Sequence, residues 1–232
     1  MTWKIFKKIA KIAGVEATRY DRRIPVFNDL FNKYREFTMV PRDLFVENLR
    51  LCHDYRSISG DFVECGVWRG GMSAAISEVL GADRKIHLFD SFEGLPSAKE
   101  IDGKEALTWQ QNVTSEGYYD NCTADQSYAI RAMTLASNQN HKIYKGWFQN
   151  TLSEIDTKSI AILRLDGDWY DSIKICLDKL FPLVEPGGLV IIDDYYTWDG
   201  CSKAVHDYLS EMRSSSRIFQ RNNGIAYLIK KG

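Results

Sequence analysis

Two apolar segments that each end in aspartates constrain this chain of 232 residues more than any other feature. Residues 188–192 follow a Pro-Gly turn and lead into the pair Asp193-Asp194, and residues 160–165 lead into Asp166 and Asp168. Short apolar runs rich in β-branched residues predict strands buried on both faces of a parallel sheet. Such strands present ligand-binding groups at their carboxyl ends. We therefore expect these carboxylates to meet at one edge of the sheet and form the functional centre.

A glycine-rich turn precedes this region and indicates a nucleoside cofactor. The segment 60–71 predicts a short strand that ends at Gly66, and the acid Asp90 ends the next predicted strand. A glycine turn followed roughly 20 residues later by a carboxylate fits a cofactor whose ribose the carboxylate binds. Dinucleotide folds require a glycine beside the pyrophosphate, but that position is Trp68 here. The spacing therefore favours S-adenosylmethionine, which has no phosphate.

The order of predicted elements indicates an α/β fold. Strand-helix units begin near residue 60, and residues 217–220 and 224–229 predict a closing antiparallel hairpin. This pattern matches the Rossmann-like class I methyltransferase fold, a seven-stranded, mostly parallel sheet with a C-terminal antiparallel hairpin. We expect an N-terminal helical extension or lid over residues 1–58 and a methyltransferase domain over residues 59–232. Residues 91–121 read as a loop that forms a wall or lid of an acceptor pocket.

Composition excludes several other classes of protein. A net charge of -1 gives no general attraction to nucleic acid. The five cysteines are scattered and contain no Cys-x-x-Cys pair, so the sequence indicates neither a zinc site nor a disulfide framework. This use of cysteine is typical of proteins in the reducing cytoplasm.

Lysines recur at helical spacing in residues 2–13, as in basic helices that lie on anionic membranes. The alternative is a terminal helix that docks on the protein body or on a second subunit.

Five motifs in order resemble the macrocin O-methyltransferase family, of the TylF and MycF type. They are residues 60–71, 89–96, 146–151, 165–170 and 192–195, and the similarity runs from about residue 36 to the C-terminus. The resemblance implies a methyltransferase that depends on S-adenosylmethionine and Mg²⁺ and acts on a sugar hydroxyl. It also implies a homo-oligomer. We expect a small-molecule or glycan acceptor.

The family's motifs place specific roles on residues of this chain. The metal-binding aspartates fall on Asp166, Asp193 and Asp194, and Asp166 is also the expected catalytic base. Asp168 lies so close that it stays open as a ligand or base. The expected cofactor-binding residues lie at or just after the ends of the first three predicted strands. They are Glu64, Gly66, Trp68, Gly70, Asp90, Ser91 and Trp147.

Two other functions remain open at this point. A catechol-type, metal-dependent O-methyltransferase would bind an aromatic diol through the same ion. A non-catalytic subunit that binds S-adenosylmethionine, or a scaffold, is the second alternative, and only the basic segment 2–13 speaks for it. In a third interpretation the aspartates cap the helices that follow them. This interpretation leaves the adjacent pair Asp193-Asp194 unexplained, because capping needs one acid per helix.

Overall fold

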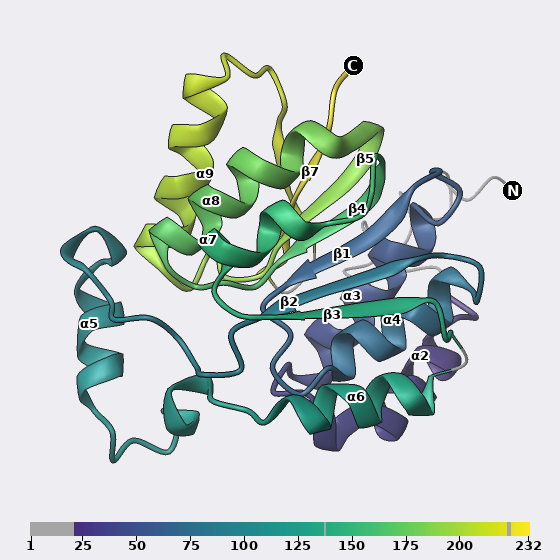
Figure 1. Cartoon of the computed structure of the whole chain (residues 1–232), viewed down its shortest axis with the longest axis horizontal. Helices are drawn as coiled ribbons and strands as arrows, with labels where there is room; N and C mark the ends of the chain where they lie inside the picture. The colour runs from purple at the N-terminus through teal and green to yellow at the C-terminus, as the bar shows by residue number, and fades with distance from the viewer. Residues whose placement is uncertain (1–20, 137, 222–223) are drawn as a thin grey trace, which may run out of the picture.

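The computed structural model describes residues 21–136, 138–221 and 224–232. Their centre is a seven-stranded sheet with the strand order β3-β2-β1-β4-β5-β7-β6 (Figure 1). The strands β1 to β5 are parallel, whereas β7 runs antiparallel to both β5 and β6. The predicted fold class is therefore confirmed. The strands are β1 (Asp61–Cys65), β2 (Ile86–Asp90), β3 (His141–Lys145), β4 (Ile160–Leu165), β5 (Val184–Ile192), β6 (Ile218–Gln220) and β7 (Ala226–Ile229).

Helices cover both faces of the sheet (Figure 1). One layer contains α2 (Ile24–Tyr34), α3 (Arg42–Asp54), α4 (Gly71–Leu80) and α6 (Gln126–Leu135). The other contains α7 (Phe148–Thr151), α8 (Tyr170–Leu180) and α9 (Asp199–Glu211). Short 3₁₀ helices η1 to η5 span Arg35–Phe37, Glu100–Asp102, Tyr119–Cys122, Leu152–Glu154 and Phe181–Leu183. This three-layer arrangement buries both faces of the parallel strands, as their near-continuous apolar sequences predict.

Each helical layer packs on the sheet through its own hydrophobic cluster. On the first face Phe45 of α3 and Ile76 of α4 join Phe62 of β1, and each is fully buried. On the second face Leu177 of α8 and Val205 of α9 join the strand residues. The N-terminal helices α2 and α3 thus share one core with the sheet. The predicted helix over residues 2–13 lies outside the described residues.

The segment between β2 and β3 is more ordered than the sequence analysis expects. It contains the helix α5 (Lys104–Gln111), which stands to one side of the sheet (Figure 1). The sequence analysis predicts a loop for these residues. The helix follows Gly103, whose φ of 93° is a conformation that glycine adopts without strain. Its one buried residue is Ala106, so the apolar periodicity that predicts a helix is nearly absent.

No helix among the described residues is long and apolar enough to cross a membrane.

Candidate active site

A cavity of about 610 Å³ lies at the carboxyl ends of the parallel strands. That volume is in the range of small-molecule sites. The strands stay hydrogen-bonded to their ends, since the Asp166 N–H donates to Cys65 and the Asp193 N–H donates to Leu165. The loops that follow β1 to β5 therefore open into one space. Residues 39–41, which precede α3, and Leu44 of α3 also line the cavity.

The turn after β1 packs directly against the end of β4. Gly66 has a φ of 90°, and a Cβ on this residue would lie 1.7 Å from the carbonyl oxygen of Asp166. No side chain fits there. Trp68 follows with a φ of 49°, a left-handed conformation that is uncommon outside glycine, and its side chain lines the cavity. The turn thus brings its backbone close to the centre of the cavity.

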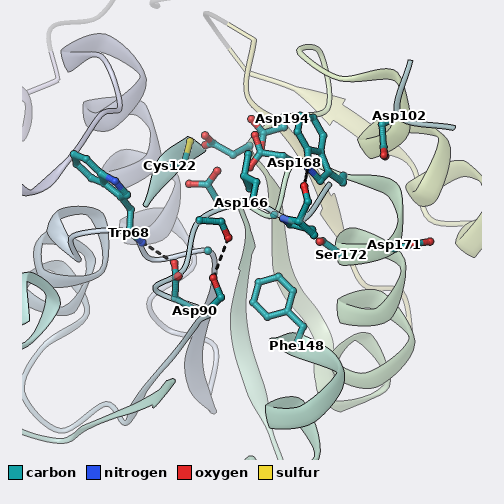
Figure 2. A pocket seen from close by; sticks show the side chains of 18 of the residues that line it. Trp68, Asp90, Asp102, Cys122, Phe148, Asp166, Asp168, Asp171, Ser172 and Asp194 are labelled. Atoms are coloured by element: carbon teal, nitrogen blue, oxygen red, sulfur yellow. Dashed lines mark hydrogen bonds between the residues drawn. The ribbon is translucent and has the colours of Figure 1, made fainter. Parts of the chain in front are cut away.

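Asp90 holds this turn in place (Figure 2). Its Oδ2 accepts hydrogen bonds from the backbone N–H groups of Val67 at 2.7 Å and Trp68 at 2.8 Å. Its Oδ1 accepts from the N–H of Phe92 at 2.6 Å. Burial raises the pKa of Asp90, and the three N–H donors act in the opposite direction. The carboxyl group also lines the cavity, so it can reach a ligand that rests on the turn.

Three aspartates form a cluster at the carboxyl ends of β4 and β5. Asp166, Asp168 and Asp194 each offer one oxygen, and these oxygens lie within 4.8 Å of one another (Figure 2). Burial and the neighbouring carboxylates raise the pKa of Asp168 to about 7 and raise that of Asp194 as well. The Oδ2 atom of Asp194 is buried and has no hydrogen-bond partner among the described residues. The cluster therefore has unused oxygen ligands and excess negative charge.

Asp193 and Asp166 share a buried guanidinium that the sequence analysis does not single out. Arg164 Nη2 donates to Asp193 Oδ1 at 2.6 Å, and Arg164 Nη1 donates to Asp166 Oδ2 at 2.7 Å. Asp193 lines the cavity but is not part of the three-aspartate cluster. Arg164 was overlooked because it stands inside an apolar strand, where its partners on other strands leave no local signal.

The expected cofactor residues divide into two groups. Most of them line the cavity: Gly66, Trp68, Asp90, Ser91 and Trp147. Glu64 and Gly70 do not. Glu64 is 1% exposed and is bonded to Ser73 and Arg164. A Cβ on Gly70 would lie 2.9 Å from the Cα atom of Ala129, so this glycine lets α4 approach α6.

A tryptophan cluster packs beside Asp168, and its member Trp169 lines the cavity. The Trp198 indole N–H donates to Asp168 Oδ1 at 2.9 Å, and the Trp169 indole N–H donates to the Pro96 carbonyl at 2.9 Å. The two rings pack edge to face, with centroids 5.2 Å apart, and Trp109 of α5 contacts both. The segment after β2 therefore forms part of the wall next to the aspartates.

Fold and site together define the class of the protein. The strand order, the antiparallel β7 and the glycine turn after β1 are those of class I methyltransferases. The sequence matches the family model of the macrocin-O-methyltransferases (TylF) over residues 34–227. The chain belongs to this family.

Two O-methyltransferases are similar to most of this chain. The 8-demethyl-8-(2,3-dimethoxy-alpha-L-rhamnosyl)-tetracenomycin-C 4'-O-methyltransferase of Streptomyces olivaceus is 35% identical over 174 residues. The mycinamicin III 3''-O-methyltransferase of Micromonospora griseorubida is 30% identical over 170 residues. Each alignment covers 70% of this chain but only 64% and 65% of the respective relative.

Solved structures agree with the fold. The O-methyltransferase NovP superposes with a TM-score of 0.72 and 26% identity, and the alignment covers 88% of both chains. The O-methyltransferase TomG from Streptomyces achromogenes superposes with a TM-score of 0.53 over the whole of both chains. At 12% identity the second similarity concerns the fold alone.

Proposed function

We propose that this chain is an O-methyltransferase that transfers the methyl group of S-adenosylmethionine to a sugar hydroxyl of a glycoside, glycan or natural product, with help from Mg²⁺. One observation carries the proposal. The three-aspartate cluster and the turn fixed by Asp90 line the same cavity. Family membership supports it, as do the relatives named for O-methylation of a rhamnosyl-tetracenomycin-C and of mycinamicin III.

The glycine turn fits a cofactor without phosphate. Gly66 lets the turn rest against the end of β4, and both Gly66 and Trp68 line the cavity. Trp68 stands at the position where dinucleotide folds need a glycine beside the pyrophosphate. Asp90 offers carboxylate oxygens suited to ribose hydroxyls, and Trp147 offers an aromatic face on the same wall. When bound, S-adenosylmethionine supplies an electrophilic methyl group on its sulfonium.

The aspartate cluster fits a hard divalent cation. Mg²⁺ prefers oxygen ligands, and the unpartnered Asp194 Oδ2 and the mutual repulsion of the carboxylates both favour a cation here. Asp166 and Asp194 would hold it, together with Asp168 or Asp193, which both line the cavity. A bound cation lowers the pKa of a coordinated hydroxyl, although Mg²⁺ does so less strongly than zinc.

The chain's own groups have two tasks in the reaction. Asp166 accepts the proton of the acceptor hydroxyl, because its carboxylate faces the cavity within the cluster. Trp169 and Leu44, which line the cavity, exclude water and orient the acceptor. Much of the rate then comes from an in-line approach of the oxygen to the methyl carbon.

Calorimetry tests the cofactor and the cation separately. We expect S-adenosylmethionine to bind the wild-type protein and Mg²⁺ to give its own signal. Replacing both Asp193→Ala and Asp194→Ala should abolish the Mg²⁺ signal and leave cofactor binding intact. Asp178→Asn, on the exposed face of α8, is the matched control and should change neither. Failure of the wild-type protein to bind S-adenosylmethionine would refute the proposal.

The acceptor class is tested with labelled S-adenosylmethionine and two panels of acceptors. Glycosides with adjacent hydroxyls should receive the labelled methyl group, whereas catechols should not. Transfer only to catechols would show that the acceptor is an aromatic diol and not a sugar. Turnover that survives the double replacement at Asp193 and Asp194 would remove the cation from the mechanism.

A further inference from the structure

Arg164 connects three strands at the base of the acidic cluster. It is the second-last residue of β4 and has no exposed surface. Its register neighbours are Glu64 on β1 and Ile191 on β5. A guanidinium at this position can reach carboxylates from all three strands without bending its own strand.

Each guanidinium nitrogen of Arg164 has an acceptor. Nη1 donates to Glu64 Oε1 and to Asp166 Oδ2, both at 2.7 Å. Nη2 donates to Asp193 Oδ1 at 2.6 Å, and Nε donates to Asn48 Oδ1 at 3.3 Å. These distances are typical of charge-assisted hydrogen bonds, apart from the longer contact to Asn48.

Arg164 does more than neutralise Glu64. Glu64 also accepts a hydrogen bond from Ser73, and a single contact to Arg164 would already pair it. The same Nη1 atom also binds one oxygen of Asp166, and Nη2 binds one oxygen of Asp193. Both aspartates line the cavity. The second oxygen of each carboxylate is not bonded to Arg164.

We propose that Arg164 is a positioning residue for the cation site, because its planar fork holds one oxygen of Asp166 and one oxygen of Asp193, the neighbour of Asp194, and leaves the second oxygen of Asp166 for the cation. The inference rests on the cation role in the proposed function. Groups that orient metal ligands commonly matter almost as much as the ligands themselves. Arginine suits this task because its charge is permanent and its donors are held in one plane.

Arg164→Lys tests the proposal, because lysine keeps the charge but loses the fork. Mn²⁺, followed by electron paramagnetic resonance, serves as the probe for the cation. We expect the Mn²⁺ dissociation constant to rise about 10- to 100-fold, the effect usual for groups behind metal ligands. The affinity for S-adenosylmethionine, measured by calorimetry, should not change, since Arg164 is outside the cavity wall.

Arg84→Lys is the matched control. Arg84 is partly buried, whereas Arg164 is fully buried, and it donates to the backbone carbonyls of Arg56, Ile58 and Gly60 at the opposite end of β1. Its replacement should lower the thermal midpoint and leave Mn²⁺ binding unchanged. A general loss of stability therefore cannot imitate the effect expected at Arg164.

The outcomes separate this inference from the proposed function. Equal Mn²⁺ affinity in the wild-type protein and Arg164→Lys would overturn the inference alone. Absence of Mn²⁺ binding by the wild-type protein would overturn both the cation role and the inference. If Arg164→Lys does not fold, a crystal structure of the wild-type protein with Mn²⁺ decides. Arg164 must then still bond Asp166 and Asp193, and a guanidinium turned away from them would refute the inference.

Discussion

At Gly66 the backbone of one strand end touches the backbone of another. The hydrogen that glycine carries in place of a side chain is what allows the turn after β1 to rest on the carbonyl of Asp166. The same contact sets the distance between the predicted cofactor turn and the aspartate cluster. A group added here therefore disturbs both parts of the site at once.

Gly66→Ala should abolish S-adenosylmethionine binding. The new methyl group would meet a backbone carbonyl that cannot rotate away, and the φ of 90° adds backbone strain. Gly81→Ala is the matched control, because Gly81 has a φ of 94° and no atom within 4 Å of the added Cβ. It should cost about 1–3 kcal/mol of stability from strain alone and leave binding intact. Calorimetric binding and urea unfolding of both variants measure the difference. Normal binding by Gly66→Ala would contradict the contact.

Sequence analysis predicts the strand ends well and their side-chain partners poorly. Apolar runs that end in acids place Asp90, Asp166 and Asp194 at the cavity, because strand direction decides which edge they reach. The sequence cannot show that Glu64 turns inward to Arg164. That choice depends on cross-strand register, which no local pattern encodes.

At the scale of elements, the segment between β2 and β3 is tied to the start of α8. Asp102 is 2% exposed, and its Oδ1 accepts the backbone N–H of Tyr170, the first residue of α8, at 2.7 Å. Its Oδ2 accepts the N–H of Lys99 at 2.7 Å. An acid at a helix N-terminus also interacts favourably with the helix dipole. One buried carboxylate thus fixes the wall of the cavity to the helix that follows β4.

Asp102→Ala should loosen this wall. Two backbone N–H groups lose their acceptor, at a cost of about 1–3 kcal/mol for a buried, unsatisfied donor. Limited proteolysis should then cut within residues 97–122 at a higher rate. Asp171→Ala is the control, because Asp171 connects the same two segments through an exposed ion pair with Lys99. It should leave the proteolysis rate unchanged, since exposed ion pairs contribute little. Equal proteolysis rates in wild type and Asp102→Ala would refute the role of Asp102.

The helix α5 shows why this segment was only partly predicted. The sequence analysis expected an acceptor-pocket wall here, and residues 94–97 line the cavity. It missed the helix, because Trp109 packs on tryptophans that follow β4 and β5. Contacts of this kind join residues distant in sequence and leave no periodic pattern around Lys104–Gln111.

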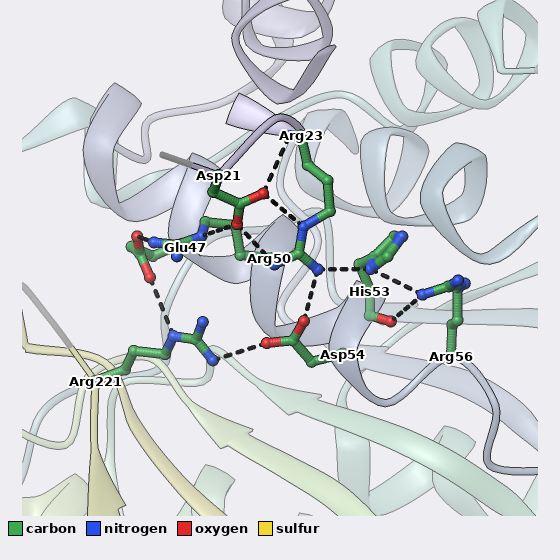
Figure 3. A network of polar contacts seen from close by, with 8 residues as sticks. All are labelled: Asp21, Arg23, Glu47, Arg50, His53, Asp54, Arg56 and Arg221. Atoms are coloured by element: carbon green, nitrogen blue, oxygen red, sulfur yellow. Dashed lines mark hydrogen bonds and ion pairs between the residues drawn. The ribbon is translucent and has the colours of Figure 1, made fainter. Parts of the chain in front are cut away.

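At the scale of the molecule, a charged network joins the N-terminal helices to the C-terminal strands (Figure 3). Arg221, between β6 and β7, pairs with Glu47 and Asp54 of α3 at 3.2 and 3.1 Å. Arg23, just before α2, pairs with Asp54 at 2.6 Å and with Asp21 at 2.7 Å. Residues 21–23 and the segment between β6 and β7 therefore both contact α3. Because residues 39–41 and Leu44 at the start of α3 line the cavity, the network also helps to hold this part of the cavity in place.

This network should make stability depend on pH in the acid range. Hydrogen bonds from Arg23 hold the pKa of Asp21 well below its usual value, although burial acts in the opposite direction. A carboxyl group with a lowered pKa in the folded state stabilises the protein above its unfolded pKa of about 3.9, and this contribution is lost as the pH falls further. We expect the wild-type free energy of unfolding in urea to fall steeply below about pH 4.

Asp21→Asn should be less stable than wild type at pH 7. The difference between their free energies of unfolding should shrink as the pH falls below about 4. Asp29→Asn is the control, since Asp29 is exposed on α2 and has no ion pair with any residue in the described part of the chain. Its stability should follow the wild-type curve at every pH. Parallel curves for wild type and Asp21→Asn would show that the pair of Asp21 with Arg23 contributes nothing to folding. The acid sensitivity would then belong to other carboxylates of the molecule.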